Sequence, residues 1–178
     1  WSHHLLSAGQ AAGEMVDFVD AELPCLVRHL QTTIPLHFRI DLVPPITITD
    51  NSSRLADAGG GLLLEIPPGR YFYHHYPYPQ PVYHQLAWQG PVRAAQHTGQ
   101  DYFDLLCEPG ECMLFFIGGK DYAQVIVNAE AALSTPYEVL GERTRKFWQA
   151  FTARRSDFNA LLPQSLPRRE QLLRAVDD

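Results

Sequence analysis

The sequence predicts a mostly β protein with flanking helices, built as a barrel or sandwich of about eight strands. Between Gly59 and Gly119, short apolar or alternating runs are interrupted every eight to twelve residues by proline and glycine, which is typical of all-β folds. Residues 14–31 and 135–153, further out on either side, show helical periodicity instead. An α+β fold with an antiparallel sheet is the alternative.

Size and composition indicate a single globular domain. The chain has 178 residues, of which 46% are hydrophobic and 19% charged, so it needs neither a metal nor a disulfide to build a core. The charge is uneven, because residues 1–137 carry six basic and fourteen acidic side chains, whereas the remainder carries eight basic and six acidic ones. An acidic body offers no electrostatic surface for nucleic acid, so we expect none as a partner.

We expect a cytoplasmic protein with no membrane partner. No apolar run approaches the roughly 18 residues of a membrane span. The three cysteines are an odd number, which does not suggest a secreted disulfide framework. The chain starts at Trp1 without a methionine, so the sequence leaves open what precedes it and whether a signal segment was removed.

Residues 1–33 are predicted to form an N-terminal helical segment. Glu14 to Gln31 carries apolar residues near the i, i+3, i+4, i+7 spacing of an amphipathic helix. Pro24 interrupts this run and either kinks one helix or begins a second. We expect the apolar stripe to pack against a sheet; its members are Met15, Val16, Val19, Leu23, Leu26, Val27 and Leu30.

Residues 34–130 are predicted to form the β core. Residues 36–42 alternate between apolar and polar side chains, as in a strand with one solvated face, and Pro44 and Pro45 end this run. Further strands are predicted over residues 46–49, 62–66, 71–76, 82–88, 102–106, 113–117 and 122–127.

The strands at 102–106 and 113–117 are predicted to pair as a hairpin with Pro109 and Gly110 in its loop. A Pro-Gly pair prefers a type II turn, which matches strand twist poorly, so we expect a wider loop. Cys107 and Cys112 would then face each other, and a short-loop disulfide is geometrically conceivable. In a reducing cytosol we expect two free thiols.

Residues 131–178 are predicted to be a helical tail packed on the core. A helix opens at Thr135-Pro136 and runs to Ala153, with Leu140, Phe147, Trp148 and Phe151 on one stripe that is a candidate dimer seam. Shorter helices are expected after Ser156 and around Pro167.

The glycine spacing of the middle stretch resembles the cupin family of small β-barrels. Gly69 is followed by five residues and then His75-Tyr76-Pro77, Tyr83 stands where the family has a glutamate, and Gly90 closes this first motif. A second motif runs from Gly110 through Phe116-Ile117-Gly118 to Asp121, where the family has a histidine.

The chain departs from the cupin pattern at the metal ligands. Of the four usual ligand positions only His75 is kept, and the others are Pro77, Tyr83 and Asp121. Proline offers no ligand atom, and neutral tyrosine is a poor one, so we expect no cofactor. The alternative is a divalent metal held by two histidines and a carboxylate, namely His75, His84 and Asp121.

A barrel without a metal can still bind a small molecule in an apolar cavity with a few polar groups. Residue 82 onwards alternates so that His84, Leu86 and Trp88 share a face, and tyrosines supply aromatic walls with polar tips. The alternative is that these side chains fill the interior. The candidate ligand-binding residues are Tyr71, Tyr73, His75, Tyr83, His84, Trp88 and Asp121.

The predicted function is a non-catalytic module, a degenerate cupin-like domain that senses a small molecule or docks a protein partner, including a second copy of itself. We assign no catalytic residue, because the sequence contains no nucleophile elbow, phosphate loop or dinucleotide fingerprint. One alternative is a metal-dependent cupin-type oxygenase or isomerase. Another is an inhibitor or adaptor protein whose contact surface is the proline-rich aromatic rim from Tyr76 to Tyr83.

Overall fold

The computed structural model describes residues 2–7, 9–42, 46–50, 60–69, 79–96 and 102–154. These residues form a mostly β protein with antiparallel sheets of seven and three strands and two helices. The strands are β1 (Ser2–Ser7), β2 (Gln10–Val19), β3 (Cys25–Thr32), β4 (Leu36–Asp41), β5 (Thr47–Asp50), β6 (Gly60–Ile66), β7 (Val82–Gln89), β8 (Val92–Gln96), β9 (Tyr102–Cys107) and β10 (Gly110–Gly118), and the helices are α1 (Tyr122–Ser134) and α2 (Tyr137–Arg154).

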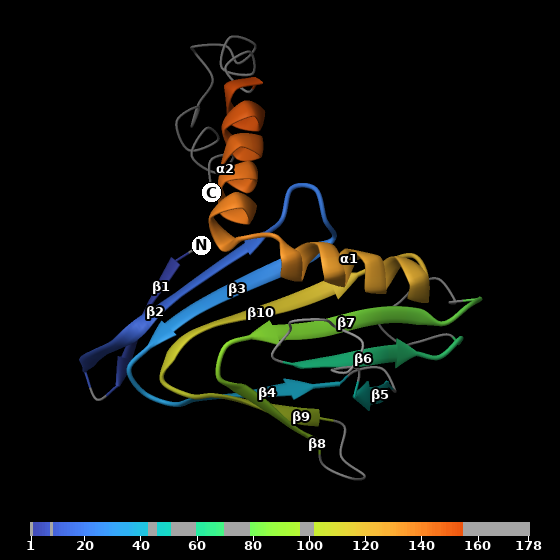
Figure 1. Cartoon of the computed structure of the whole chain (residues 1–178), viewed down its shortest axis with the longest axis horizontal. Helices are drawn as coiled ribbons and strands as arrows, with labels where there is room; N and C mark the ends of the chain where they lie inside the picture. The colour runs from blue at the N-terminus through green and yellow to red at the C-terminus, as the bar shows by residue number, and fades with distance from the viewer. Residues whose placement is uncertain are drawn as a thin grey trace, which may run out of the picture.

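The small sheet continues the centre of the large one. The large sheet has the order β1-β2-β3-β10-β7-β6-β5, and the small sheet has the order β4-β9-β8. The three central strands β3, β10 and β7 are joined in the chain to β4, β9 and β8, and they keep the same neighbours on both sides of the bends. Figure 1 shows the three bends side by side. We call this line of bends, made by residues 33–35, 90–91 and 108–109, the crease.

Proline and glycine make the crease. Pro35, Pro91 and Pro109 each lack the N–H group that an uninterrupted strand would need for its ladder. Gly90 has φ +87°, and a Cβ atom there would lie 2.5 Å from the carbonyl oxygen of Glu111. Two of the bends are tied together by the N–H group of Glu108, which donates to the carbonyl oxygen of Pro91 at 2.9 Å.

Replacing Gly90 with alanine should destabilise the fold, because the methyl group meets backbone at a positive φ that alanine rarely adopts. We expect Gly90→Ala to lower the free energy of unfolding by roughly 2–4 kcal/mol in urea denaturation. The matched control is Gly141→Ala in the first half of α2, where a Cβ atom meets nothing within 4 Å. Equal effects of the two substitutions would contradict this account of the crease.

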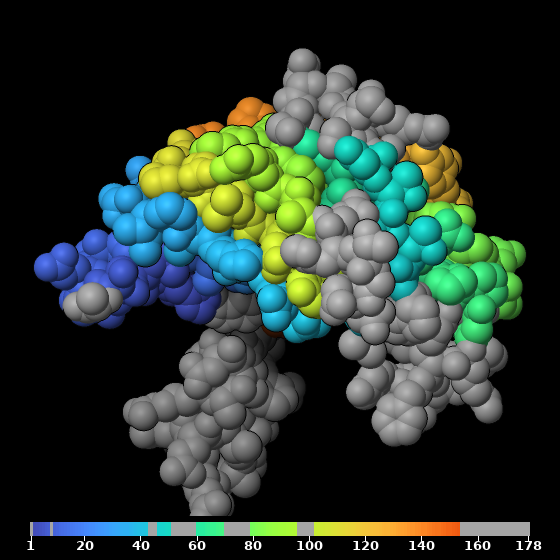
Figure 2. Space-filling model, turned by 90° about the horizontal axis from the view of Figure 1, so that it is seen from below, coloured from blue at the N-terminus to red at the C-terminus, as the bar shows by residue number. Residues whose placement is uncertain are grey.

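The folded-over sheet gives the described part of the protein two cores. The first lies between the sheets and contains Leu30, Leu86 and Leu114 from the large sheet with Phe103 and Leu105 from the small one. The second lies on the other face of the large sheet, under the two helices, with α1 packed on β7 and β10. Seen from below in Figure 2, the N-terminal strands (blue) are at one end of the molecule and β6 and β7 (green) at the other.

The prediction of an N-terminal helix over residues 14–31 was wrong, since this run forms β2 and β3 with Pro24 in the turn between them. Both faces of β3 are covered: Val27 belongs to the core under the helices, and Leu30 belongs to the core between the sheets. A strand with apolar residues on both faces has no clean alternation, so its periodicity cannot be told from that of a helix.

Two further predictions are corrected. Residues 122–127 begin α1 rather than a last strand, because the Asp121 side chain caps the helix by accepting the N–H of Gln124 at 2.9 Å. The strands predicted as a hairpin exist as β9 and β10, but they belong to different sheets and do not pair with each other.

The other strand predictions in the described residues are confirmed, at 36–42, 46–49, 62–66 and 82–88, and so is the helix opening after Pro136. The strand predicted at 71–76 and the short helices after Ser156 lie outside the described residues.

Candidate functional site

The predicted pocket residues do not form one group in the described structure. His84 and Trp88 share the face of β7 that points toward the small sheet, whereas Tyr83 lies on the opposite face with its ring 5.7 Å from that of Tyr122. His84 is exposed, and Asp121 caps α1. Tyr71, Tyr73 and His75 lie outside the described residues.

Trp88 is part of the packed core between the sheets. Its ring lies over Gly60, where a Cβ atom would approach to 2.3 Å, and the indole is 5% exposed. Among the described residues, no group of three or more His, Cys, Asp or Glu side chains is placed to hold a metal ion.

The feature that sequence reasoning missed is the way helix α2 is mounted. Its first half is anchored on the large sheet, where Leu140 is fully buried in the core under the helices. The Tyr137 ring stacks on the His29 ring with centroids 4.2 Å apart, and His29 Nε2 lies 2.8 Å from Glu111 Oε1. The start of α2 therefore packs on β2 and β3, where the Tyr137 ring meets Phe18 and His29.

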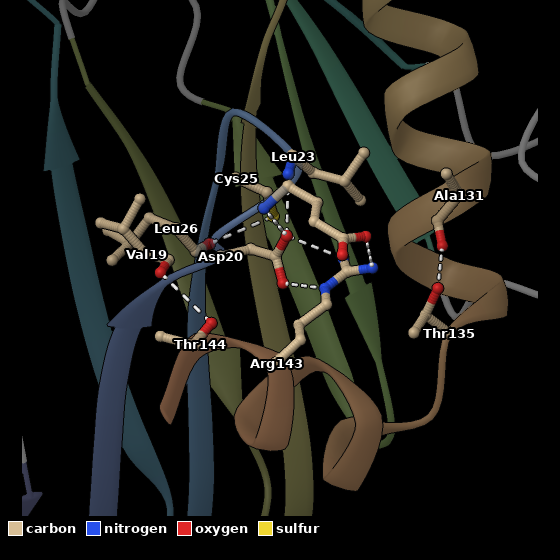
Figure 3. A network of polar contacts seen from close by, with 10 residues as sticks. Val19, Asp20, Leu23, Cys25, Leu26, Ala131, Thr135, Arg143 and Thr144 are labelled. Atoms are coloured by element: carbon tan, nitrogen blue, oxygen red, sulfur yellow. Dashed lines mark hydrogen bonds and ion pairs between the residues drawn. The ribbon is translucent and has the colours of Figure 1, made fainter. Parts of the chain in front are cut away.

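A buried ion pair fixes the next turn of α2 (Figure 3). The Arg143 guanidinium donates from Nε to Asp20 Oδ2 and from Nη2 to Asp20 Oδ1, both at 2.7 Å. The Asp20 side chain is 0% exposed and that of Arg143 is 20% exposed. Asp20 Oδ1 also accepts the backbone N–H groups of Glu22 at 2.9 Å and Leu23 at 2.8 Å. All of these donors converge on one carboxylate, which satisfies its buried charge.

This ion pair is surrounded by smaller contacts between α2 and the turn joining β2 to β3. Arg143 Nη1 donates to Glu22 Oε2 at 3.0 Å, and the Thr144 hydroxyl lies 3.5 Å from the carbonyl oxygen of Val19. The hydrogen bonds to Asp20 raise the pKa of Arg143 above its ordinary value. Burial, helped by the negative charge of Asp20, raises the pKa of the nearby Cys25 thiol to about 12, so this thiol is unreactive.

Beyond Thr144, α2 leaves the body of the protein. Residues 145–153 are all exposed, and we call them the arm. Figure 1 shows the arm projecting away from the sheets. Three aromatic side chains of the arm are about half exposed, Phe147 at 49%, Trp148 at 54% and Phe151 at 48%. Their rings contact one another, with centroids 5.5–6.5 Å apart.

The aromatic residues continue the face of α2 that is buried at its base. At 100° per residue, Phe147, Trp148 and Phe151 lie on the same side of the helix as Leu140 and Thr144, which are both buried. The stripe therefore begins in the core and runs out past the edge of the sheet. Val19, at that edge, is also exposed and extends the apolar surface toward the body.

Basic side chains accompany the arm. Arg145 and Lys146 lie beside the stripe, and both pair with Glu142, at 2.7 Å and 3.4 Å. These pairs are exposed, so they contribute little to stability and leave the arm basic on its flank. The sequence predicted the apolar stripe of α2. Which residues of the stripe are buried depends on where the sheet beneath the helix ends, and the sequence does not show that.

Comparison with known proteins adds nothing to this description, because no protein-family model, curated protein or solved structure matches the chain. Within the described ranges, no helix is both long and apolar enough to cross a membrane.

The role of the Asp20–Arg143 ion pair in anchoring α2 can be tested by replacing the arginine. Arg143→Ala should lower the free energy of unfolding by roughly 2–4 kcal/mol, because it leaves the buried Asp20 carboxylate without its partner. Chemical denaturation measures this effect. Arg145→Ala is the matched control on the same helix: it breaks only an exposed pair and should cost less than about 0.5 kcal/mol. If the two variants unfold at the same denaturant concentration, Asp20–Arg143 is not the anchor.

Proposed function

We propose that the protein is a non-catalytic docking module whose arm binds a second copy of the chain. The observation that supports this is the set of three contacting aromatic rings, each about half exposed, on a helix that is fixed at its base. Exposed aromatic side chains in a contiguous group mark interaction surfaces, and a fixed helix loses little conformational entropy when it is covered.

Two-fold symmetry suits this surface. In an antiparallel pair of arms related by a two-fold axis near Trp148, Phe147 of one copy meets Phe151 of the other, and the apolar stripes cover each other. The end of each arm then reaches the base of the other helix, where Val19 is exposed.

Charge also favours a second copy as the occupant. Residues 1–137 carry eight more acidic than basic side chains, whereas Arg145 and Lys146 make the flank of the arm basic. When the arm of one copy lies beside the body of the other, unlike charges approach each other. This charge complementarity raises the rate at which two copies associate. It also disfavours binding of the basic arm to proteins whose surfaces are basic.

The expected dimer is weak. Burying the exposed halves of three aromatic side chains in each copy removes roughly 600 Å² from water, below the 1,200–2,000 Å² of a standard interface. At about 25 cal/mol per Å², the gain only modestly exceeds the entropic cost of association. We therefore expect a dissociation constant in the micromolar range, so that the assembly forms and dissociates readily with concentration.

Sedimentation equilibrium over about 1–200 µM protein tests the proposal, since it spans the expected dissociation constant. We expect a monomer mass at the low end and a dimer mass at the high end. Trp148→Ala combined with Phe151→Ala should weaken association at least about tenfold, the equivalent of 1.4 kcal/mol. Gln149→Ala, an exposed substitution on the opposite side of the arm, should leave it unchanged.

Three outcomes would overturn the proposal. The full chain stays a monomer throughout the concentration range, or Gln149→Ala weakens association as much as the aromatic variant. In the third, only a chain ending at residue 154 dimerises, which would mean that the remaining C-terminal residues occupy the aromatic surface instead of a second copy.

The cupin-like barrel, with its sensing and metal-dependent alternatives, remains a hypothesis beside this one. The folding of β3, β10 and β7 into β4, β9 and β8 is compatible with part of a barrel wall. Elemental analysis of untagged protein separates the alternatives. If the protein holds about one equivalent of Fe, Mn, Ni or Zn, and His75→Ala loses that metal, the metal-dependent cupin-type enzyme is favoured. A metal-free protein whose melting temperature rises with a single metabolite would favour the sensor.

A further inference from the structure

Two thiols meet at the crease. Cys107 ends β9 in the small sheet, and Cys112 lies near the start of β10 in the large sheet. Both are free cysteines, 0% and 2% exposed, and both side chains belong to the core between the sheets. The two thiols are near enough for each to shift the pKa of the other.

The contact is a product of the crease and not of strand pairing. Cys107 stands opposite Leu36 and Val92 in the small sheet, whereas Cys112 stands opposite Leu30 in the large one. The four residues between the cysteines carry the chain from one sheet into the other. Gly90 supports this arrangement, because a Cβ atom there would come within 3.0 Å of Cys112.

The surroundings favour a thiolate on Cys107. The interaction with Cys112 lowers the pKa of Cys107, burial opposes this shift, and the nearby Arg28 guanidinium lowers the pKa further. Arg28 is held in place by Asp17, with Nε donating to Oδ1 at 2.8 Å and Nη2 to Oδ2 at 2.7 Å. The same interaction, together with burial, raises the pKa of Cys112. Of the two thiols, Cys107 is therefore the better nucleophile, and Cys112 lies beside it as the second thiol.

We propose that Cys107 and Cys112 form an oxidisable dithiol that hydrogen peroxide converts into a disulfide joining the two sheets across the crease. The thiolate of Cys107 attacks one peroxide oxygen, and the O–O bond breaks to give a sulfenic acid and hydroxide. The sulfur of Cys112 then displaces the sulfenic oxygen, which leaves as water. The two thiols together lose two protons and two electrons, and the peroxide is reduced to two molecules of water.

Because Cys107 and Cys112 are buried, only some oxidants can reach their thiols. A small neutral peroxide enters a packed core during local opening far more readily than a bulky disulfide reagent does. The native protein should therefore react with hydrogen peroxide but stay unreactive toward an aromatic disulfide reagent. Cys25 is equally buried, but among the described residues it has no thiol neighbour, and its raised pKa keeps it protonated. It serves as the internal control.

The experiment treats the reduced full chain with hydrogen peroxide and counts thiols after unfolding. The three free thiols should fall to one, with a mass loss of two hydrogens that dithiothreitol reverses. Cys25→Ala should fall from two thiols to none at the same rate. The Cys107→Ala variant cannot form this disulfide, so peroxide should not lower its mass by two hydrogens. Each of these results supports the proposal.

A digest that needs no variant protects the test against a substitution that fails to fold. A protease that cleaves after glutamate cuts between Glu111 and Cys112 and so separates the two cysteines, whereas the bond after Glu108 precedes Pro109 and resists cleavage. The oxidised wild-type protein should then yield the two peptides linked by a disulfide. A peroxide-treated protein that keeps three thiols, or that links Cys25 or a second chain instead, overturns the proposal.

Discussion

The bending of three adjacent strands along one line is the constraint on which the described structure depends. Because β3, β10 and β7 fold over together, one sheet has a covered inner face and an outer face that is free to accept helices. Each bend combines a proline, which cannot continue a ladder, with neighbours that tolerate a turn. The three bends lie on neighbouring strands in both sheets, so they form one continuous line. Both cores, the thiol pair and the mounting of α2 follow from this geometry.

A second, smaller constraint is the charge buried under α2. Asp20 and Arg143 are 123 residues apart in sequence, yet their side chains meet in a two-point contact that the surrounding backbone N–H groups complete. A buried carboxylate with several donors has one favourable position, so the pair fixes the direction of the helix as well as its attachment. Hydrophobic contact through Leu140 alone would permit the helix to slide or rotate. The exposed aromatic stripe is presented in a defined direction for this reason.

The two proposals concern different parts of the molecule and different chemistry. The arm is exposed, aromatic and basic at its flank, which suits reversible association. The thiol pair is buried in the opposite core, on the other side of the large sheet from the helices, and its chemistry is covalent. Oxidation would stiffen the body without touching the arm, so association and oxidation are separable properties.

The sequence by itself determined the residues that build strands with one wet face, such as 36–42, and the amphipathic helix after Pro136, because alternation and the 3.6-residue period are local properties. It placed a loop at Pro109 and Gly110, but as the tip of a hairpin and not as a bend between two sheets. It did not determine that 14–31 is a pair of strands, because a strand covered on both faces has no distinctive period. Nor did it determine that Phe147, Trp148 and Phe151 lie beyond the edge of the sheet, or that the two cysteines meet across a crease instead of a hairpin. Those facts depend on which strands pair at long range, and only the tertiary structure decides that pairing.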